Sequence, residues 1–138
     1  MDQGTCRIMV VDDEPEVSQS LASTLSLLTG QAVEPYEDPY LALQAFLKMP
    51  YDLVITDISM PRIDGYELIR RMRALMPACD FIVVTAHRNA ETVQRARVAG
   101  AARLFFKPVD VAALEAAVGE TMARHDYWAR LLASVTGG

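Results

Sequence analysis

Residues 53–57 of the chain are Leu-Val-Ile-Thr-Asp, a short apolar run rich in β-branched residues that ends in the carboxylate of Asp57. Such a run predicts a strand buried on both faces, as in a parallel sheet. Three further apolar runs also end in polar residues: residues 9–11 precede Asp12 and Asp13, residues 81–84 precede Thr85, and residues 104–106 precede Lys107. Because open α/β sheets bind ligands beyond the carboxyl ends of their strands, these polar residues mark the predicted site.

The segments between the apolar runs have helical periodicity, and this alternation predicts a parallel sheet of about five strands with about five helices. Strands are expected near residues 7–11, 32–35, 53–56, 81–84 and 104–106. Helices are expected to begin at or just after Pro15, Asp38, Asp64, Asn89 and Asp110, which are residue types typical of a helix start. The first helix should end at Gly30, and the second should bury Leu41, Ala45 and Leu47.

Composition favours one soluble domain. The chain has 138 residues, of which 51% are hydrophobic and 22% charged, enough for a single buried core. Its 13 basic and 18 acidic residues give a net charge of -5, which argues against direct nucleic-acid binding. Cys6 and Cys79 form no CxxC pattern and are expected to be buried in a cytoplasmic protein. Since no leader-like segment opens the chain and no apolar run approaches membrane-spanning length, we expect neither export nor membrane contact.

The acidic residues at the strand ends predict a divalent-metal site. Asp12, Asp13 and Asp57 would repel one another unless a cation or protons shared the cluster. Mg²⁺ fits best because it takes oxygen ligands and is usually bound by one or two carboxylates and a phosphate oxygen, whereas Ca²⁺ needs more protein ligands. Lys107 places a cation opposite the cluster, and the Thr85 hydroxyl can donate to a bound anion. Together these groups indicate phosphoryl transfer with a carboxylate nucleophile.

Each of these residues also has an ordinary structural explanation when taken alone. Asp12 and Asp13 could form a solvated turn and helix cap, Thr85 a turn at a strand end, and Asp57 a cap for the loop that follows it. It is their joint occurrence at the ends of successive apolar runs that favours a functional site.

The same residues resemble a known family. Residues 10–15 (Val-Val-Asp-Asp-Glu-Pro), 57–65 (Asp-Ile-Ser-Met-Pro-Arg-Ile-Asp-Gly), 85–86 (Thr-Ala) and 107–108 (Lys-Pro) resemble a chemotaxis-regulator-like response-regulator receiver domain of two-component signalling. The resemblance covers about residues 7–122. It implies a flavodoxin-like, doubly wound α/β fold with a five-stranded parallel sheet of order 2-1-3-4-5 and five helices.

The resemblance implies a signalling domain rather than an enzyme, one that assists its own phosphorylation and dephosphorylation. Asp57 would be the phosphoacceptor, with a phosphohistidine on a sensor histidine kinase or phosphotransfer protein as donor. Asp12, Asp13, Asp57 and the Ser59 backbone carbonyl would bind Mg²⁺.

The remaining site roles also follow from the resemblance. The Thr85 hydroxyl and the Ala86 amide would bind the phosphoryl oxygens, and Lys107 would pair with one of them. The Lys107–Pro108 peptide bond would be cis, and Gly65 would support the loop after the acceptor.

One position departs from the family pattern. Three positions before the lysine, the family usually has an aromatic residue that switches the surface formed by the fourth helix, fifth strand and fifth helix. This chain has Leu104 at that position. Phe105 or Phe106 could substitute, although strand alternation favours a core position for Phe106. Ser59 and His87 flank the expected path of attacking water, so they should govern the lifetime of the phosphoryl group, with a pH dependence if His87 takes part.

We predict a receiver domain over residues 1–125 and, over residues 126–138, a helical extension or linker toward an output domain, target protein or homodimer partner. Trp128, Leu131, Leu132 and Val135 keep helical spacing there and need a partner, or else the tail folds back or frays. The pattern assigns no role to His125.

Three other classes compete with this interpretation. A haloacid-dehalogenase-type phosphohydrolase also uses Asp, Thr and Lys at strand ends, but it opens with Asp-x-Asp and places its acidic pair last. A dinucleotide-binding module would need glycines after the first strand, where this chain has Asp-Asp-Glu-Pro. A phosphorylation-independent interaction module of the same fold remains open because of Leu104.

Overall fold

The computed structural model describes residues 6–137. Five strands alternate with five helices along the chain. Their bounds are β1 Ile8–Val11, α1 Pro15–Thr29, β2 Val33–Tyr36, α2 Pro39–Lys48, β3 Leu53–Thr56, α3 Gly65–Leu75, β4 Asp80–Thr85, α4 Ala90–Ala99, β5 Arg103–Phe106 and α5 Val111–Val135. Residues 1–5 and Gly138, which belong to the predicted domain and extension, lie outside the described residues.

The five strands form one parallel sheet in the order β2-β1-β3-β4-β5. This order confirms the flavodoxin-like doubly wound fold. In the register, Val11 of β1 lies beside Thr56 of β3, so Asp12 and Asp57 follow adjacent positions on neighbouring strands. β2 is an edge strand and contains Pro35, a residue that sheets accept at their edges.

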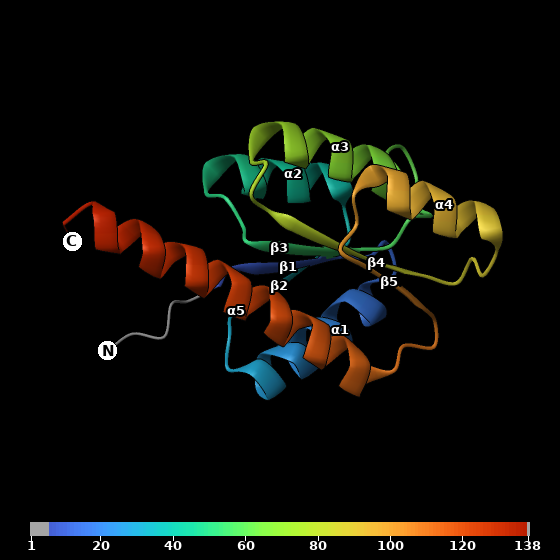
Figure 1. Cartoon of the computed structure of the whole chain (residues 1–138). Coiled ribbons are helices and arrows are strands. Elements are labelled where there is room, and N and C mark those ends of the chain that lie inside the picture. Colours follow the sequence, from blue (N-terminus) through green and yellow to red (C-terminus); the bar gives the residue numbers. More distant parts are fainter. Residues whose placement is uncertain (1–5, 138) are drawn as a thin grey trace.

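Helices cover both faces of the sheet, with α2, α3 and α4 on one face and α1 and α5 on the other (Figure 1). Successive strand residues therefore enter different apolar layers: Met9 and Val11 pack toward α2–α4, whereas Ile8 and Val10 pack toward α1 and α5. Each such fully buried aliphatic side chain contributes about 1.5–3 kcal/mol. Burial on both faces explains why the strands are continuous apolar runs.

Local hydrogen bonds fix the predicted helix starts. In four helices the side-chain oxygen of the N-cap accepts a hydrogen bond from a backbone N–H of the first turn, which satisfies a donor that the helix leaves free. The cap and donor pairs are Asp38 with Tyr40, Asp64 with Glu67, Asn89 with Thr92, and Asp110 with Ala113. Gly30 ends α1 with a left-handed φ of 71°, also as predicted.

The predicted inward face of α2 is wrong for Leu41 and Leu47, which are 53% and 60% exposed. Ala45 does pack against the core, and the helix buries Ala42 and Phe46. The Phe46 ring stacks on Tyr51, with 6.2 Å between ring centroids and 12° between planes. Burying this aromatic pair sets the rotation of α2, because an aromatic ring removes more apolar surface from water than a leucine does.

The predicted core position of Phe106 is also wrong. Leu104 packs against the α2–α4 layer and Phe105 against the α1–α5 layer. Phe106, at the end of β5, lies under the Arg88 guanidinium, 4.6 Å from its ring centroid. Alternation alone cannot choose between the two phenylalanines when both sheet faces are covered.

Both cysteines are buried and free, as expected. Burial raises the pKa of the Cys6 thiol to about 11, and burial likewise raises the pKa of Cys79. Both thiols are therefore protonated and unreactive near neutral pH. Within residues 6–137, no helix combines the length and the apolar character needed to cross a bilayer.

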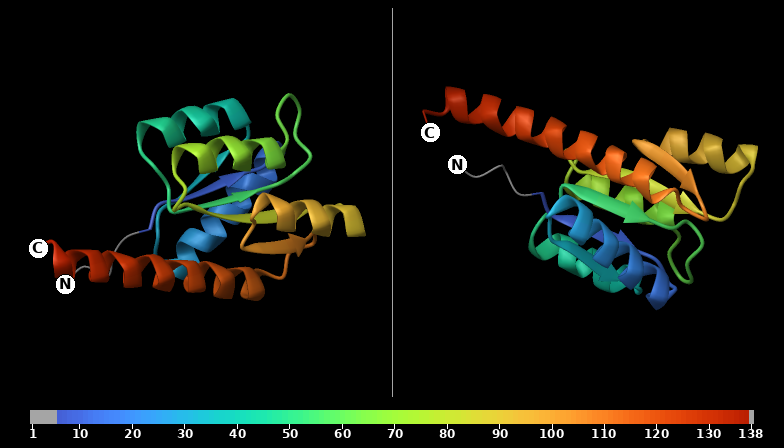
Figure 2. Two further views of the ribbon diagram at one scale, coloured as in Figure 1. Left: turned by 45° about the horizontal axis from the view of Figure 1, so that its top comes forward. Right: turned by 90° about the horizontal axis from the view of Figure 1, so that it is seen from below.

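Helix α5 continues without a break to Val135 and projects past the sheet (Figure 2). Its buried residues, Leu114, Ala117, Val118 and Thr121, all lie in its first half. Beyond His125, large apolar side chains are exposed, among them Trp128 at 60% and Leu132 at 63%. The division of the chain at residue 125 stays a prediction.

His125, to which the sequence pattern assigns no role, ties α5 to the amino-terminal edge of the sheet. Its Nε2 lies 2.9 Å from the Asp80 carboxylate, its Nδ1 lies 3.6 Å from Asp52, and Arg124 donates to the same Asp80 oxygen. The hydrogen bond to Asp80 raises the pKa of His125, and the nearby Asp52 adds to this effect, against burial and the charge of Arg124. The cation is therefore stabilised in the folded protein.

Replacing His125 with Gln should destabilise the protein at acidic pH and have little effect at alkaline pH. Because folding raises the pKa of His125, the stabilisation is complete below an unfolded-state pKa of about 6.5 and is lost as pH rises through the folded-state value. Urea unfolding should show a loss of about 1 kcal/mol near pH 6 and almost none near pH 9. An equal loss at both pH values would contradict the ionic role.

Candidate functional site

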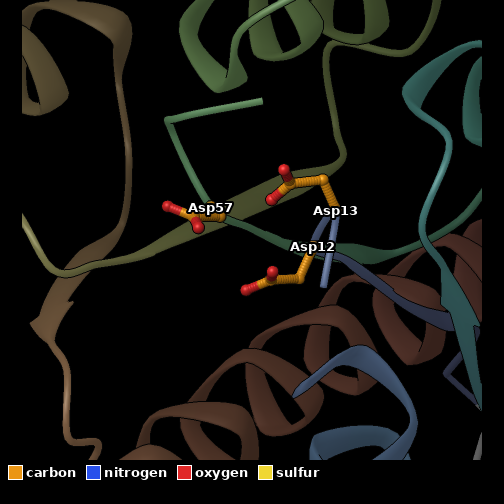
Figure 3. A group of neighbouring side chains, drawn as sticks. All are labelled: Asp12, Asp13 and Asp57. Atoms are coloured by element: carbon orange, nitrogen blue, oxygen red, sulfur yellow. The ribbon is translucent and has the colours of Figure 1, made fainter. Parts of the chain in front are cut away.

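Three carboxylates meet at the carboxyl edge of the sheet. Asp12 and Asp13 follow β1 and Asp57 follows β3, and Figure 3 shows the three side chains grouped beyond these strand ends. Carboxylate oxygens from all three lie within 4.8 Å of one another. Asp12 and Asp57 are buried, at 3% and 8% exposure. The structure thus brings together the three acidic residues that the sequence predicted.

The Asp57 carboxylate is held by its own loop. Its Oδ1 accepts hydrogen bonds from the backbone N–H groups of Ile58, at 2.6 Å, and Ser59, at 3.4 Å. The Gly65 N–H donates to the Ile58 carbonyl at 2.9 Å and closes the loop. These contacts engage Oδ1 and leave Oδ2 directed toward Lys107.

Lys107 bridges two of the carboxylates. Its Nζ lies 2.8 Å from Asp12 Oδ2 and 3.1 Å from Asp57 Oδ2, with Glu14 at 4.0 Å. Burial lowers the pKa of the Lys107 ammonium, but hydrogen bonds to Asp12 and Asp57 outweigh burial, so the pKa is raised. The approach of Glu14 to Lys107 was not predicted, although Glu14 directly follows the acidic pair in the sequence.

Thr85 and Ala86 lie at the end of β4, at the same edge of the sheet. The Thr85 side chain is fully buried and its hydroxyl accepts a hydrogen bond from the His87 N–H at 3.1 Å. Between residues 6 and 137 this hydroxyl has no hydrogen bond to Asp57 or Lys107. The Lys107 N–H donates to the Thr85 carbonyl, and the Lys107–Pro108 peptide bond is cis, as the resemblance implied.

The two residues predicted to control phosphoryl lifetime contact each other. His87 Nε2 lies 2.5 Å from Ser59 Oγ, and both side chains are exposed beside the acceptor loop. Leu104, at the position of the usual switch aromatic, is partly buried and packs against the α2–α4 layer. Phe106, two residues further along β5, is partly buried and lies under Arg88.

The acidic cluster fits a hard divalent cation. The donors are carboxylate oxygens, and they already converge to within 4.8 Å without an ion. Such a donor set suits Mg²⁺, which prefers oxygen ligands and few protein contacts. Lys107 now offsets part of the negative charge and therefore competes with a bound cation.

Replacing Lys107 with Ala should tighten Mg²⁺ binding by about tenfold, because removal of the ammonium leaves the carboxylates without their counter-charge. Isothermal titration calorimetry would measure the dissociation constant. The chain has one other lysine, Lys48, which is exposed at the end of α2, and Lys48→Ala removes the same charge as a control. Equal affinities in the two variants would show that Lys107 does not compete with the cation.

Comparisons with known proteins agree with this geometry. Residues 8–119 match the family described as response regulator receiver domain. The chain is 37% identical over 129 residues to the virulence sensor protein BvgS of Bordetella pertussis, covering 88% of this chain and 10% of BvgS. It is 33% identical over 117 residues to the transcriptional regulatory protein FixJ of Azorhizobium caulinodans, covering 85% of this chain and 55% of FixJ.

The fold also matches solved structures. A response regulator receiver domain protein (CheY-like) from Methanospirillum hungatei JF-1 aligns with a TM-score of 0.81 and 25% identity, over 90% of this chain and 98% of that one. The chain spans only a small part of the sensor proteins that it matches and about half of FixJ. Since the family match covers most of its length and includes the acidic cluster and Lys107, the chain belongs to the response regulator receiver domain family of two-component signalling.

Proposed function

We propose that Asp57 accepts a phosphoryl group from a phosphohistidine on a sensor histidine kinase or a phosphotransfer protein. The observation that carries this proposal is the state of the Asp57 carboxylate: it is 8% exposed, anchored through Oδ1, and turned through Oδ2 toward Lys107. An Asp57 oxygen forms the new bond to phosphorus as the phosphorus–nitrogen bond breaks, and the electron pair returns to the imidazole nitrogen.

The other residues would stabilise the transferred group. Asp12, Asp13, Asp57 and the Ser59 carbonyl would hold Mg²⁺, which supplies positive charge near the phosphoryl oxygens when bound. Lys107 would exchange its bond to Asp57 for one to a phosphoryl oxygen. The Thr85 hydroxyl, which now accepts from His87, still has its own hydrogen to donate, and the Ala86 N–H would donate beside it.

The signal would leave through the surface formed by α4, β5 and α5. An aspartyl phosphate adds nearly two negative charges, enough to draw Thr85 and its loop inward. Leu104 leaves no aromatic at the usual switch position, so Phe106 and the Arg88 above it are the groups placed to respond. Residues 126–138, as the end of α5, would connect this surface to an output domain, target protein or second subunit.

The direct test is intact mass spectrometry of the chain after incubation with acetyl phosphate. The proposal expects one added phosphoryl group with Mg²⁺ present and none after chelation of the metal. Failure to gain the group under conditions that label another receiver would favour a phosphorylation-independent interaction module. Multiple turnover of a phosphate ester would instead indicate a phosphohydrolase.

Replacing His87 with Ala should slow dephosphorylation by about tenfold, because the variant loses the imidazole that contacts Ser59 beside the acceptor. Decay of the phosphorylated mass with time would measure this. His125→Gln removes the only other histidine, at the opposite edge of the sheet, and is the control. Unchanged decay in His87→Ala would exclude this role.

A further inference from the structure

A groove of about 790 Å³ runs between α3 and α4, outside the acidic cluster. These helices lie side by side over the same face of the sheet (Figures 1 and 2). Its lining combines apolar and basic side chains and includes Tyr66, Arg70, Arg73, Pro77, Arg95 and Val98. No acidic side chain is among the described residues that line it.

The apolar part of the groove is open to solvent. Val98 is 86% exposed, and it lines the groove from the last turn of α4. Pro77 and Ala99 extend this apolar surface. A side chain from another molecule could therefore remove apolar area from water at this point without displacing any part of the chain.

The basic part of the groove includes one guanidinium that has no carboxylate partner among the described residues. The Arg95 guanidinium stacks on the Tyr66 ring, 4.2 Å from its centroid, and has no carboxylate partner in the described chain. Arg73 is already engaged: one terminal nitrogen donates to the Gly100 carbonyl at 2.9 Å, the guanidinium lies 5.0 Å from the centroid of the Phe81 ring, and its Nε is buried. Arg70 is also engaged, because Glu67 binds it.

These two properties define the kind of ligand. The Arg95 guanidinium, which has no carboxylate partner among the described residues, calls for a carboxylate, since arginine binds carboxylates with charge-assisted hydrogen bonds. The exposed valine between the helices calls for an apolar side chain next to that carboxylate. The lining of the groove carries arginines and no acidic side chain, whereas the whole chain has a net charge of -5, so the groove suits a ligand of negative charge.

We propose that the α3–α4 groove binds a short acidic, amphipathic segment of a partner protein. An apolar side chain of the segment packs on Val98 and Pro77, and a carboxylate of the segment pairs with Arg95. The proposal concerns a surface separate from Asp57, so binding is measured without Mg²⁺ or phosphoryl donor and does not depend on the proposed phosphorylation.

The test begins with a library of random peptides of about twelve residues displayed on phage and selected on the full chain. The proposal expects enriched peptides that combine Asp or Glu with large apolar residues. A fluorescein-labelled copy of the most enriched peptide is then titrated with protein by fluorescence anisotropy. Binding should weaken by at least about tenfold in Val98→Glu and in Arg95→Gln, and should weaken as salt rises.

Leu27→Glu is the matched control. Leu27 is 85% exposed, much like Val98, but it lies on α1, across the sheet from the groove. This variant should bind the peptide as the parent chain does. Circular dichroism melting of all variants checks folding, and since Val98 and Leu27 are both exposed, neither charge should disturb the core.

Several results would overturn the proposal. They are the absence of enriched peptides, a basic or purely apolar consensus, and equal binding to the parent chain and to Val98→Glu. Sedimentation equilibrium tests whether the groove binds a second copy of the chain. If the parent chain dimerises and Val98→Glu does not, the groove is a dimer interface and the partner-segment proposal is wrong.

Discussion

Replacing Asp57 with Asn is expected to abolish phosphoryl uptake from acetyl phosphate, a loss of at least about 100-fold. The asparagine side chain has the size of aspartate and could still accept hydrogen bonds from Ile58 and Ser59 through its carbonyl oxygen. It has no anionic oxygen to form a bond to phosphorus. The substitution therefore removes the nucleophile and keeps the loop, and intact mass spectrometry would show the unmodified mass alone.

A matched control for this experiment is Asp110→Asn. It makes the same chemical change at the N-cap of α5, where Asn caps as well as Asp does, and it should leave uptake and folding unchanged. A phosphoryl group on Asp57→Asn, located on another residue by peptide mapping, would contradict the assignment of the acceptor.

Asp13→Asn should lower phosphoryl uptake because it weakens metal binding. Uptake by this variant should recover at high Mg²⁺, whereas uptake by the Asp57 variant should not.

Replacing Gly65 with Ala should destabilise the protein by about 3 kcal/mol and slow phosphoryl uptake. An added Cβ would overlap the Asp57 carbonyl oxygen and lie 2.9 Å from the Ile58 Cα. Both obstacles are backbone atoms of the acceptor loop, so either the loop or the start of α3 must move. A shift of the Asp57 carboxylate by a fraction of an ångström is enough to lower the rate of uptake.

Gly119→Ala is the control for the glycine prediction. Gly119 lies in α5 with nothing within 4 Å of a Cβ, so alanine should stabilise the helix by about 0.5–1 kcal/mol. Urea unfolding measures both variants, and acetyl phosphate labelling measures uptake. If Gly65→Ala matched the parent chain in stability and in uptake rate, the close approach of α3 to the acceptor loop would not be needed for stability or for phosphoryl uptake.

The sheet and the helix starts were predictable because their causes are local. A strand buried on both faces must be apolar at successive positions, as in residues 53–56, and a cap such as Asp64 bonds to an amide three residues away. The face of α2 was not predictable in this way. Its sequence contains two apolar stripes, and the choice of Phe46 over Leu41 and Leu47 depends on Tyr51, which lies outside the helix.

The site was predictable to a similar extent. Its polar residues directly follow apolar runs in the sequence, and the carboxyl ends of parallel strands lie at one edge of the sheet. The grouping of Asp12, Asp13, Asp57 and Lys107 follows from these two facts. The sequence does not show that Thr85 now bonds to the His87 amide instead of a side chain of the cluster. Nor does it show the contact of His125 with Asp80, whose partners are 45 residues apart and meet only after α5 has packed on the sheet.

The proline in β2 has a consequence for how these molecules meet one another. A strand arriving from a neighbouring molecule at this edge would find no amide at Pro35, so its hydrogen-bond ladder would be interrupted there. The opposite edge, β5, is four residues long and begins with the exposed Arg103. Neither margin is a good template for intermolecular β-structure. At high concentration, copies of the chain should therefore contact one another through helices and side chains, and these contacts are reversible. Contact through the backbone pairing that seeds aggregates is not expected.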